Sequence, residues 1–162
     1  MHTLVLLLGG NRGNTKKIFQ EATKLLSEQL GTITSSSSIY RSESWGFTDE
    51  QDFLNQIIIL ETDENPETCL DICLSIENYL GRTRATQQSG YTSRNIDIDI
   101  LFFDSAIIQE EKLQIPHPHI QNRRFTLEPL CEILPNFIHP VIQEKCSTLL
   151  EMCTDDLRVE KI

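Results

Sequence analysis

The stretch Arg94–Phe103 constrains the chain most, because isoleucines alternate with polar residues along its first half. A period of two predicts a β-strand with one buried face. The isoleucines then point toward the core, while Asp97 and Asp99 lie on the opposite face. Two residues of strand rise separate their Cα atoms by about 6.5–7 Å, so the two carboxylates lie side by side.

Two neighbouring carboxylates repel each other, and each resists ionisation unless a cation lies between them. Hard divalent cations prefer carboxylate oxygen, and two such ions about 3.5–4 Å apart fit between side chains of this spacing. The other interpretation is a solvated polar face on an edge strand. This stretch alone leaves both interpretations open.

The bulk composition is that of a soluble globular protein, with 39% hydrophobic and 23% charged residues. Its 162 residues predict one domain spanning 1–162. The longest apolar runs, Leu4–Leu8 and Ile57–Leu60, are too short to cross a bilayer. The first residues do not have the basic-then-apolar pattern of a secretory leader, so we expect no secretion. The five cysteines include no Cys-x-x-Cys pair. We therefore expect a cytoplasmic protein with reduced thiols and no membrane partner.

The charge is unevenly distributed along the chain. A net charge of −10 argues against nucleic acid as a partner. The segment Arg82–Arg124, however, holds six basic and five acidic side chains, so it carries +1 while the remainder carries −11. A local arginine cluster in an acidic protein favours a site for a small polyanion, the alternative being ordinary surface arginines.

Hydrophobic periodicity and turn residues predict the order strand, helix, strand, strand, helix, strand. This order is typical of an α+β, ferredoxin-like βαββαβ core, with an antiparallel sheet, helices on one face and the other face open for a ligand. The expected elements are Thr3–Leu8, a helix capped by Asn14 or Thr15 and stopped by Gly31, Thr32–Arg41, Phe53–Glu61, a helix from Asn65-Pro66 to Gly81, and the strand of Arg94–Phe103.

Two polar segments are predicted to be loops. Ser42–Asp52 carries the only tryptophan, Trp45, which is either a partly buried anchor or a ligand-stacking residue. Arg82–Ser93 holds almost no apolar residue, so we expect a mobile loop that serves as a lid or merely as a connector.

The C-terminal third is predicted to add a small hairpin and two helices to the core. The hairpin pairs Ala106–Ile108 with Leu113–Ile115, and the helices cover Phe125–Leu134 and Lys145–Cys153. Pro129 is expected to interrupt or end the first helix. The polar tail Asp155–Ile162 is expected to fray.

Five groups of residues, taken together, resemble one family. They are Tyr40-Arg41, Phe53-Leu54-Asn55, Gly81-Arg82-Thr83-Arg84, Arg94-Asn95-Ile96-Asp97-Ile98-Asp99, and Pro116-His117-Pro118 followed by Asn122-Arg123-Arg124-Phe125. In this order and at these separations the chain resembles the 6-hydroxymethyl-7,8-dihydropterin pyrophosphokinases of folate biosynthesis, from about Thr3 to Leu134. That family transfers the terminal pyrophosphoryl group of ATP to the hydroxymethyl oxygen of the pterin and leaves AMP.

The resemblance implies a role for each matching residue. Asp97 and Asp99 would hold two Mg²⁺ ions, and with Arg82 and Arg94 they would form the catalytic set. The residues implied at the ATP site are Glu77, Arg84, Arg94, Ile100, Lys112, Leu113, Gln114, His117 and Arg123. Those implied at the pterin site are Ser42, Glu43, Trp45, Phe53, Asn55, Asp97 and Phe125.

The chain departs from the family pattern at three places. The lid loop is slightly longer and lacks a tryptophan, Thr92 replaces a small residue, and Phe53 stands where tyrosine is common. None removes a metal ligand or a phosphate arginine, so we expect an active enzyme with ATP and the pterin as its small-molecule substrates. We also expect a monomer. The alternatives are a two-metal phosphodiesterase or nucleotidyltransferase, and a non-catalytic ferredoxin-like module that binds a small ligand.

Overall fold

The computed structural model describes residues 1–43, 52–85 and 95–162, with positions 82–85 described as backbone only. The elements in chain order are β1 (His2–Gly10), α1 (Thr15–Gln29), β2 (Thr32–Ser36), β3 (Tyr40–Ser42), β4 (Phe53–Thr62), α2 (Pro66–Ala85), β5 (Asp97–Phe103), β6 (Ile108–Gln109), β7 (Gln114–Ile115), the 3₁₀ turn η1 (Ile120–Asn122), α3 (Arg124–Ile133), α4 (Cys146–Met152) and β8 (Val159–Lys161).

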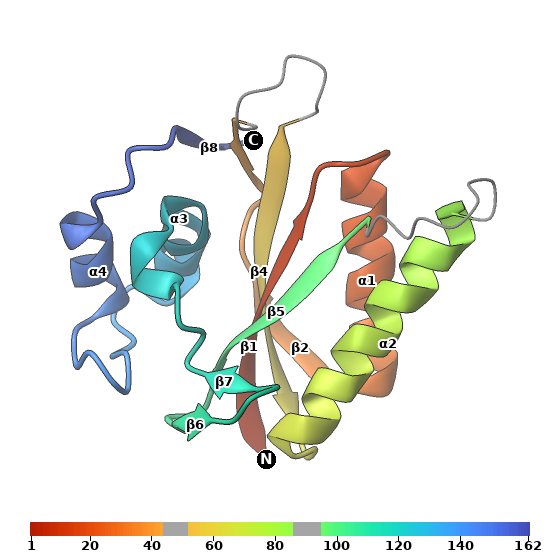
Figure 1. The fold of residues 1–162 in the computed structure, drawn as a ribbon, viewed down its shortest axis with the longest axis horizontal. Coiled ribbons are helices and arrows are strands. Elements are labelled where there is room, and N and C mark those ends of the chain that lie inside the picture. Colours follow the sequence, from red (N-terminus) through yellow and green to blue (C-terminus); the bar gives the residue numbers. More distant parts are fainter. Residues whose placement is uncertain (44–51, 86–94) are drawn as a thin grey trace.

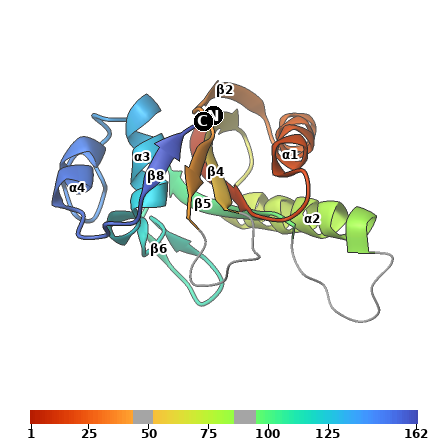
Figure 2. The same cartoon turned by 90° about the horizontal axis from the view of Figure 1, so that it is seen from above.

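The architecture is an antiparallel sheet between two helical layers (Figure 1). The strand order is β5-β1-β4-β3-β8, with β2 also paired to β4, and every pair is antiparallel. Viewed from above, α1 and α2 lie on one side of the sheet and α3 and α4 on the other (Figure 2). The predicted α+β, ferredoxin-like class is confirmed.

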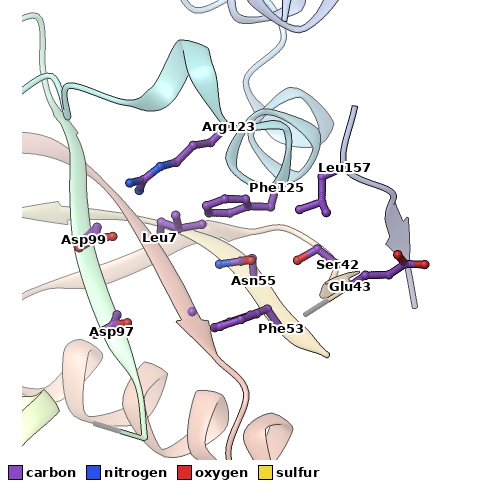
Figure 3. A pocket seen from close by; sticks show the side chains of 11 residues that line it. Leu7, Ser42, Glu43, Phe53, Asn55, Asp97, Asp99, Arg123, Phe125 and Leu157 are labelled. Atoms are coloured by element: carbon purple, nitrogen blue, oxygen red, sulfur yellow. The ribbon is translucent and has the colours of Figure 1, made fainter. Parts of the chain in front are cut away.

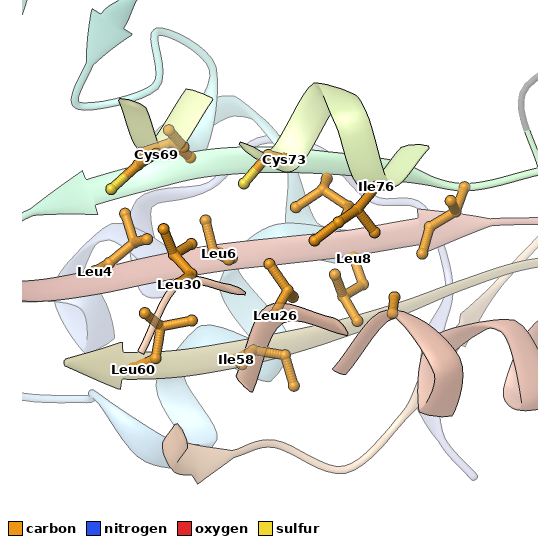
Figure 4. Close-up of a cluster of buried hydrophobic side chains, with 14 of the residues drawn as sticks. Leu4, Leu6, Leu8, Leu26, Leu30, Ile58, Leu60, Cys69, Cys73 and Ile76 are labelled. Atoms are coloured by element: carbon orange, nitrogen blue, oxygen red, sulfur yellow. The ribbon is translucent and has the colours of Figure 1, made fainter. Parts of the chain in front are cut away.

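The larger core lies between the sheet and helices α1 and α2. Alternate residues of β1, namely Leu4, Leu6 and Leu8, point into it and are fully buried (Figure 4). Helix α1 begins where the carboxamide oxygen of Asn14 accepts a hydrogen bond from the Lys17 amide at 3.3 Å, as the cap prediction required. This core fixes which residues of each strand face the opposite side, because strand side chains alternate.

The second face of the sheet is mostly covered, so the prediction that it is open was wrong over most of its area. Helices α3 and α4 pack onto Val5, Leu7 and their neighbours and form a second buried cluster. A register shift opposite Val5 places the consecutive residues Leu101 and Phe102 in this same cluster. At the end of the face that carries Gly9, a pocket lies between the strands and the start of α3.

Three of the expected element boundaries were wrong. The single strand Thr32–Arg41 is two strands, β2 and β3, because Ser37 lies between them and its hydroxyl accepts the Ile57 amide at 2.9 Å. Helix α2 continues beyond Gly81 to Ala85, through the first residues of the predicted loop. Helix α3 continues past Pro129 to Ile133, because the ring is buried on its packed side and only one helical N–H is lost.

The C-terminal tail is ordered rather than frayed. Strand β8 pairs with β3, with Val159 opposite Ser42 and Lys161 opposite Tyr40. The Arg41 guanidinium also donates to Glu160 at 2.9 Å. Backbone pairing offsets the polar composition that predicted fraying, and the tail becomes the outer strand of the sheet.

Gly31→Ala should lower the free energy of unfolding by about 2 kcal/mol, because packing tolerates no extra methyl group there. A β-carbon at Gly31 would lie 1.9 Å from the Glu61 carbonyl oxygen, which is backbone and cannot move freely. Gly81→Ala is the matched control. It meets nothing within 4 Å inside α2 and should raise stability by about 0.5–1 kcal/mol. Urea denaturation of both variants measures the difference, and equal midpoints would contradict it.

No helix in the described ranges is long and apolar enough to cross a membrane. All five cysteines are free thiols, and Cys69 and Cys73 are packed in the larger core. The pKa of the Cys73 thiol is raised to about 12, mainly by burial. This side chain is therefore a neutral packing group.

Candidate active site

A pocket of about 290 Å³ opens on the second sheet face, at the end that carries Gly9. Its walls come from four strands, the start of α3 and the C-terminal segment (Figure 3). The lining residues are Leu7, Gly9, Ser42, Glu43, Phe53, Asn55, Asp97, Asp99, Arg123, Phe125 and Leu157. Eight of these were implied by the family resemblance, and they come from segments more than 80 residues apart.

Strand register explains why distant residues meet in this pocket. Asp97 on β5, Gly9 on β1 and Asn55 on β4 stand opposite one another in a single row across the sheet. Directly paired residues of antiparallel strands point to the same face. Asp99 pairs with Leu7 in the next row on that face. The sheet therefore presents two carboxylates and an amide to one space.

Gly9 forms the floor between Asp97 and Asn55. A β-carbon at Gly9 would lie 2.9 Å from the Asn55 amide nitrogen, so a larger residue would displace that side chain. Asn55 is only 5% exposed, and its amide nitrogen donates to the Leu8 carbonyl at 3.2 Å. Because Gly9 has no side chain, the Asn55 carboxamide can occupy the space beside it.

A buried carboxylate fixes the strand between the two aspartates. The Ile98 amide donates to Glu77 Oε1 at 2.7 Å, across the gap between β5 and α2. Glu77 is 5% exposed and does not line the pocket. Because β5 is the outer strand of the sheet, a side chain from α2 takes the place of a strand partner there. Glu77 therefore holds the backbone from which Asp97 and Asp99 project.

Two aromatic rings border the polar floor. Figure 3 shows Asn55 between Phe53, at the start of β4, and Phe125, in the first turn of α3. Phe53 is 37% exposed, which is high for an aromatic side chain. The Arg123 guanidinium lies 5.6 Å from the centre of the Phe125 ring, a cation–π distance. Two aromatic rings, whose faces can stack on a flat molecule, and a cation therefore border the pocket.

His117 follows the β6–β7 hairpin and is held in one tautomer. Its Nδ1 accepts a hydrogen bond from the His119 amide at 3.1 Å, which leaves Nε2 to carry the proton. Burial, followed by the charges of Arg123 and His119, lowers the pKa of His117 to about 4. At neutral pH His117 is therefore an uncharged hydrogen-bond donor through Nε2.

Acid should destabilise the protein through His117. An unfolded histidine gains a proton below about pH 6.5, whereas this folded one gains it only near pH 4, so the unfolded state binds more protons between these values. We expect stability to fall as the pH drops from 6.5 to about 4, and this contribution to be constant below that.

His117→Asn, which retains an acceptor near the Nδ1 position, should flatten part of that slope in denaturation curves measured from pH 7 to pH 4.5. Burial also lowers the pKa of His139, so part of the fall in stability with decreasing pH remains in both the wild type and the variant. Identical slopes for the wild type and the variant would contradict the prediction.

Among the described side chains implied at the ATP site, only Arg123 lines the pocket. His117 lines a different cavity, beside β6 and β7. Ile100 and Leu113 are buried in the larger core, whereas Lys112 and Gln114 are exposed around β7. Trp45 and Arg94 lie outside the described residues, as do the side chains of Arg82 and Arg84. The roles of all these residues stay predictions.

Sequence reasoning missed three residues of the pocket. Leu7 looked like one member of a buried apolar run, and Gly9 lay just beyond the expected strand Thr3–Leu8 although it is the eighth residue of β1. Leu157 lies in the tail and carried no sequence signal. Alternation along β1 was the one available clue, since Leu7 and Gly9 are in phase with Val5 on the second face.

The chemistry of Asp97 and Asp99 fits a magnesium site that is completed by a substrate. Among the described residues, no three or more His, Cys, Asp or Glu side chains gather as a complete metal cage. Mg²⁺ commonly binds one or two protein carboxylates and takes its other ligands from phosphates and water. Two carboxylates at the rim of a pocket match that pattern.

Comparison with known proteins supports one family. The sequence profile of the family described as "7,8-dihydro-6-hydroxymethylpterin-pyrophosphokinase (HPPK)" matches residues 5–135. A 2-amino-4-hydroxy-6-hydroxymethyldihydropteridine pyrophosphokinase of Bacillus subtilis is 36% identical over 157 residues, which are 96% of this chain and 89% of that protein. Its counterpart in Porphyromonas gingivalis is 34% identical over 141 residues, 86% of this chain and 95% of that protein.

Solved structures agree on the fold. The wild-type HPPK-DHPS of Plasmodium falciparum superposes with a TM-score of 0.73 at 18% identity, covering 93% of this chain. The chain spans 44% of that longer protein. At such low identity the structural match supports the fold, while the sequence matches supply the family. The chain belongs to the 7,8-dihydro-6-hydroxymethylpterin-pyrophosphokinase family and is an ATP-dependent diphosphotransferase.

Proposed function

We propose that the pocket binds 6-hydroxymethyl-7,8-dihydropterin and transfers the pyrophosphoryl group of ATP to its hydroxyl group. The hydroxymethyl oxygen attacks the β-phosphorus of ATP and loses its proton, and the bond from the β-phosphorus to the oxygen bridging the α-phosphorus breaks. AMP leaves with that oxygen. The observation that carries the proposal is the pocket itself, where Asp97 and Asp99 share one face of the sheet with Asn55, and where the rings of Phe53 and Phe125 line the same space.

The pterin is a flat heterobicycle with an amide-like edge, and the rings of Phe53 and Phe125 suit its faces. Asn55, fixed by its bond to the Leu8 carbonyl, is placed to read the polar edge. Ser42 and Glu43 add polar groups from β3 and the residue after it. A buried amide beside aromatic walls is the usual composition of a selective small-molecule site.

The reacting end of the pterin is assigned to the side of the pocket formed by β5. Asp97 and Asp99 are on that outer strand, whereas Ser42 is on β3, three strands away in the sheet order. Adjacent strands lie about 4.8 Å apart, so about 14 Å separates the two ends. That span accommodates a bicyclic ring with its hydroxymethyl arm and the first phosphate of ATP.

Asp97 and Asp99 would hold two Mg²⁺ ions, which when bound neutralise phosphate charge and orient the attacking oxygen. Arg123 supplies a permanent positive charge to the same rim, and its contact with Phe125 limits its motion. His117, which is uncharged at neutral pH and does not line the pocket, would donate a hydrogen bond to a phosphate through Nε2. Arg82, Arg84 and Arg94 are assigned to the phosphates by the resemblance.

The test is an assay for AMP with ATP and Mg²⁺, run with and without the hydroxymethyl pterin. We expect one AMP and one pterin diphosphate per turnover, and no appreciable AMP without the pterin. Pterin-independent hydrolysis would favour the two-metal phosphodiesterase. Binding of the pterin without turnover would favour a non-catalytic module.

A further inference from the structure

The C-terminal segment after α4 closes one side of the pocket. Leu157 lines the pocket, although it lies beyond residues 5–135, which the family profile matches. Figure 3 shows its side chain beside Phe125, at the end of the pocket opposite Asp97 and Asp99. The sheet order gives the same placement, because β8 follows two residues later and is the outer strand on the side away from β5.

The segment is fastened to the first residue of α3. The Arg124 side chain donates to the Asp155 carbonyl at 2.7 Å and to the Cys153 carbonyl at 3.3 Å. The Arg124 amide donates to one Asp155 carboxylate oxygen at 3.0 Å, and the other accepts the Leu157 amide at 3.1 Å. Asp155 thus links the start of α3 directly to the backbone of Leu157.

A second attachment fixes the other end of the segment. Val159 pairs with Ser42, a residue that lines the pocket, and the Ile162 amide donates to the Ile39 carbonyl at 3.0 Å. Leu157 is therefore held between two attachments, one to the helix that carries Phe125 and one to the strand that carries Ser42. A half-buried leucine held in this way has little freedom to leave the pocket.

We propose that Leu157 is a binding residue for the pterin, contacting the end of the ring remote from the hydroxymethyl group, and that Arg124 is the residue that positions it. This inference rests on the proposed function. Ser42 and Glu43 supply polar groups at this end of the pocket, and Leu157 supplies an apolar wall. This wall limits the distance between the pterin ring and Asp97. The expected consequence is on pterin affinity and not on the reaction at the β-phosphorus.

Leu157→Ala tests the wall. Removing most of a leucine contact should raise the Kd and KM for the pterin by about tenfold. The KM for ATP and kcat at saturating pterin should remain within about twofold. Leu150→Ala is the matched control, because Leu150 is also partly buried but packs against the second core and does not line the pocket. Titration calorimetry and steady-state kinetics supply the measurements.

Arg124→Met tests the attachment, since it keeps most of the aliphatic stem and removes the donors. We expect it to raise the pterin KM in the same way, and the double variant with Leu157→Ala to show little further loss, because both act through one contact. Fully additive effects would overturn the positioning role. Thermal melting shows whether the Arg124→Met variant is folded. If it is not, the Leu157→Ala variant still tests the proposed contact with the pterin.

The outcomes separate the two levels of the proposal. A wild-type protein that neither binds nor converts the pterin would remove the proposed function and this inference together. An active wild type whose pterin Kd is unchanged in Leu157→Ala, or changed equally in Leu150→Ala, would overturn the inference alone.

Discussion

Asp97→Asn and Asp99→Asn should each lower kcat by about a thousandfold while the protein remains folded. The two carboxylates lie on one face of β5, at the pocket rim, where the proposed Mg²⁺ ions would meet the phosphates. A carboxamide keeps the size of the side chain but removes the charge that a hard cation prefers. Loss of charge stabilisation worth several kcal/mol corresponds to this reduction in rate.

Asp104→Asn is the matched control for the aspartate variants. Asp104 immediately follows the far end of β5 and accepts hydrogen bonds from the Thr3 amide at 2.8 Å and from His2 at 2.7 Å. It does not line the pocket, so AMP formation should continue at the wild-type rate. Wild-type turnover by either Asp97→Asn or Asp99→Asn would show that the metal assignment is wrong.

Asn55→Leu should lower kcat/KM for the pterin by about a hundredfold and leave ATP binding intact. The Asn55 side chain is 5% exposed and is fixed by its bond to the Leu8 carbonyl. The other β4 residue that lines the pocket is Phe53, which has no polar group to replace the amide. Loss of the Asn55 amide would leave the polar edge of the ring buried without a hydrogen-bond partner. This costs more binding free energy than the loss of an apolar contact does.

Gln56→Leu provides the comparison for Asn55→Leu. It makes the same chemical change one position along β4, where the side chain faces away from the pocket and donates to the Ser37 carbonyl at 2.9 Å. Pterin kinetics should be unchanged in this variant. If both variants lost kcat/KM for the pterin and melting temperature equally, the Asn55→Leu effect would come from a less stable fold. That result would contradict a contact between Asn55 and the substrate.

Local sequence patterns predicted most elements because their signals are short-range. Alternation identified β5, and the cap expected at Asn14 or Thr15 located the start of α1, where Asn14 is the cap. The errors arose where a distant partner outweighed the local signal. Pairing with β3 ordered the polar tail as β8, and packing on the second face carried α3 past Pro129.

For the site, too, the sequence identified some residues and not others. The resemblance named Asn55, Asp97 and Phe125 from motif residues, and the pocket brings all three together. It did not name Leu157, because a solitary leucine in a polar tail has no motif. Nor did it indicate that Glu77 lies buried behind β5, bound to the Ile98 amide. That contact depends on how α2 lies against the outer strand.

By itself, the sequence determined that Asp97 and Asp99 share one face of a strand, because side-chain direction in a strand depends only on spacing. It also determined the family, through the order and separation of motif residues. Only the tertiary structure decided what faces those carboxylates. Register placed Gly9 and Asn55 in the same row as Asp97, and the segment before β8 closed the opposite end with Leu157. These are contacts between residues far apart in the chain, and no local pattern specifies them.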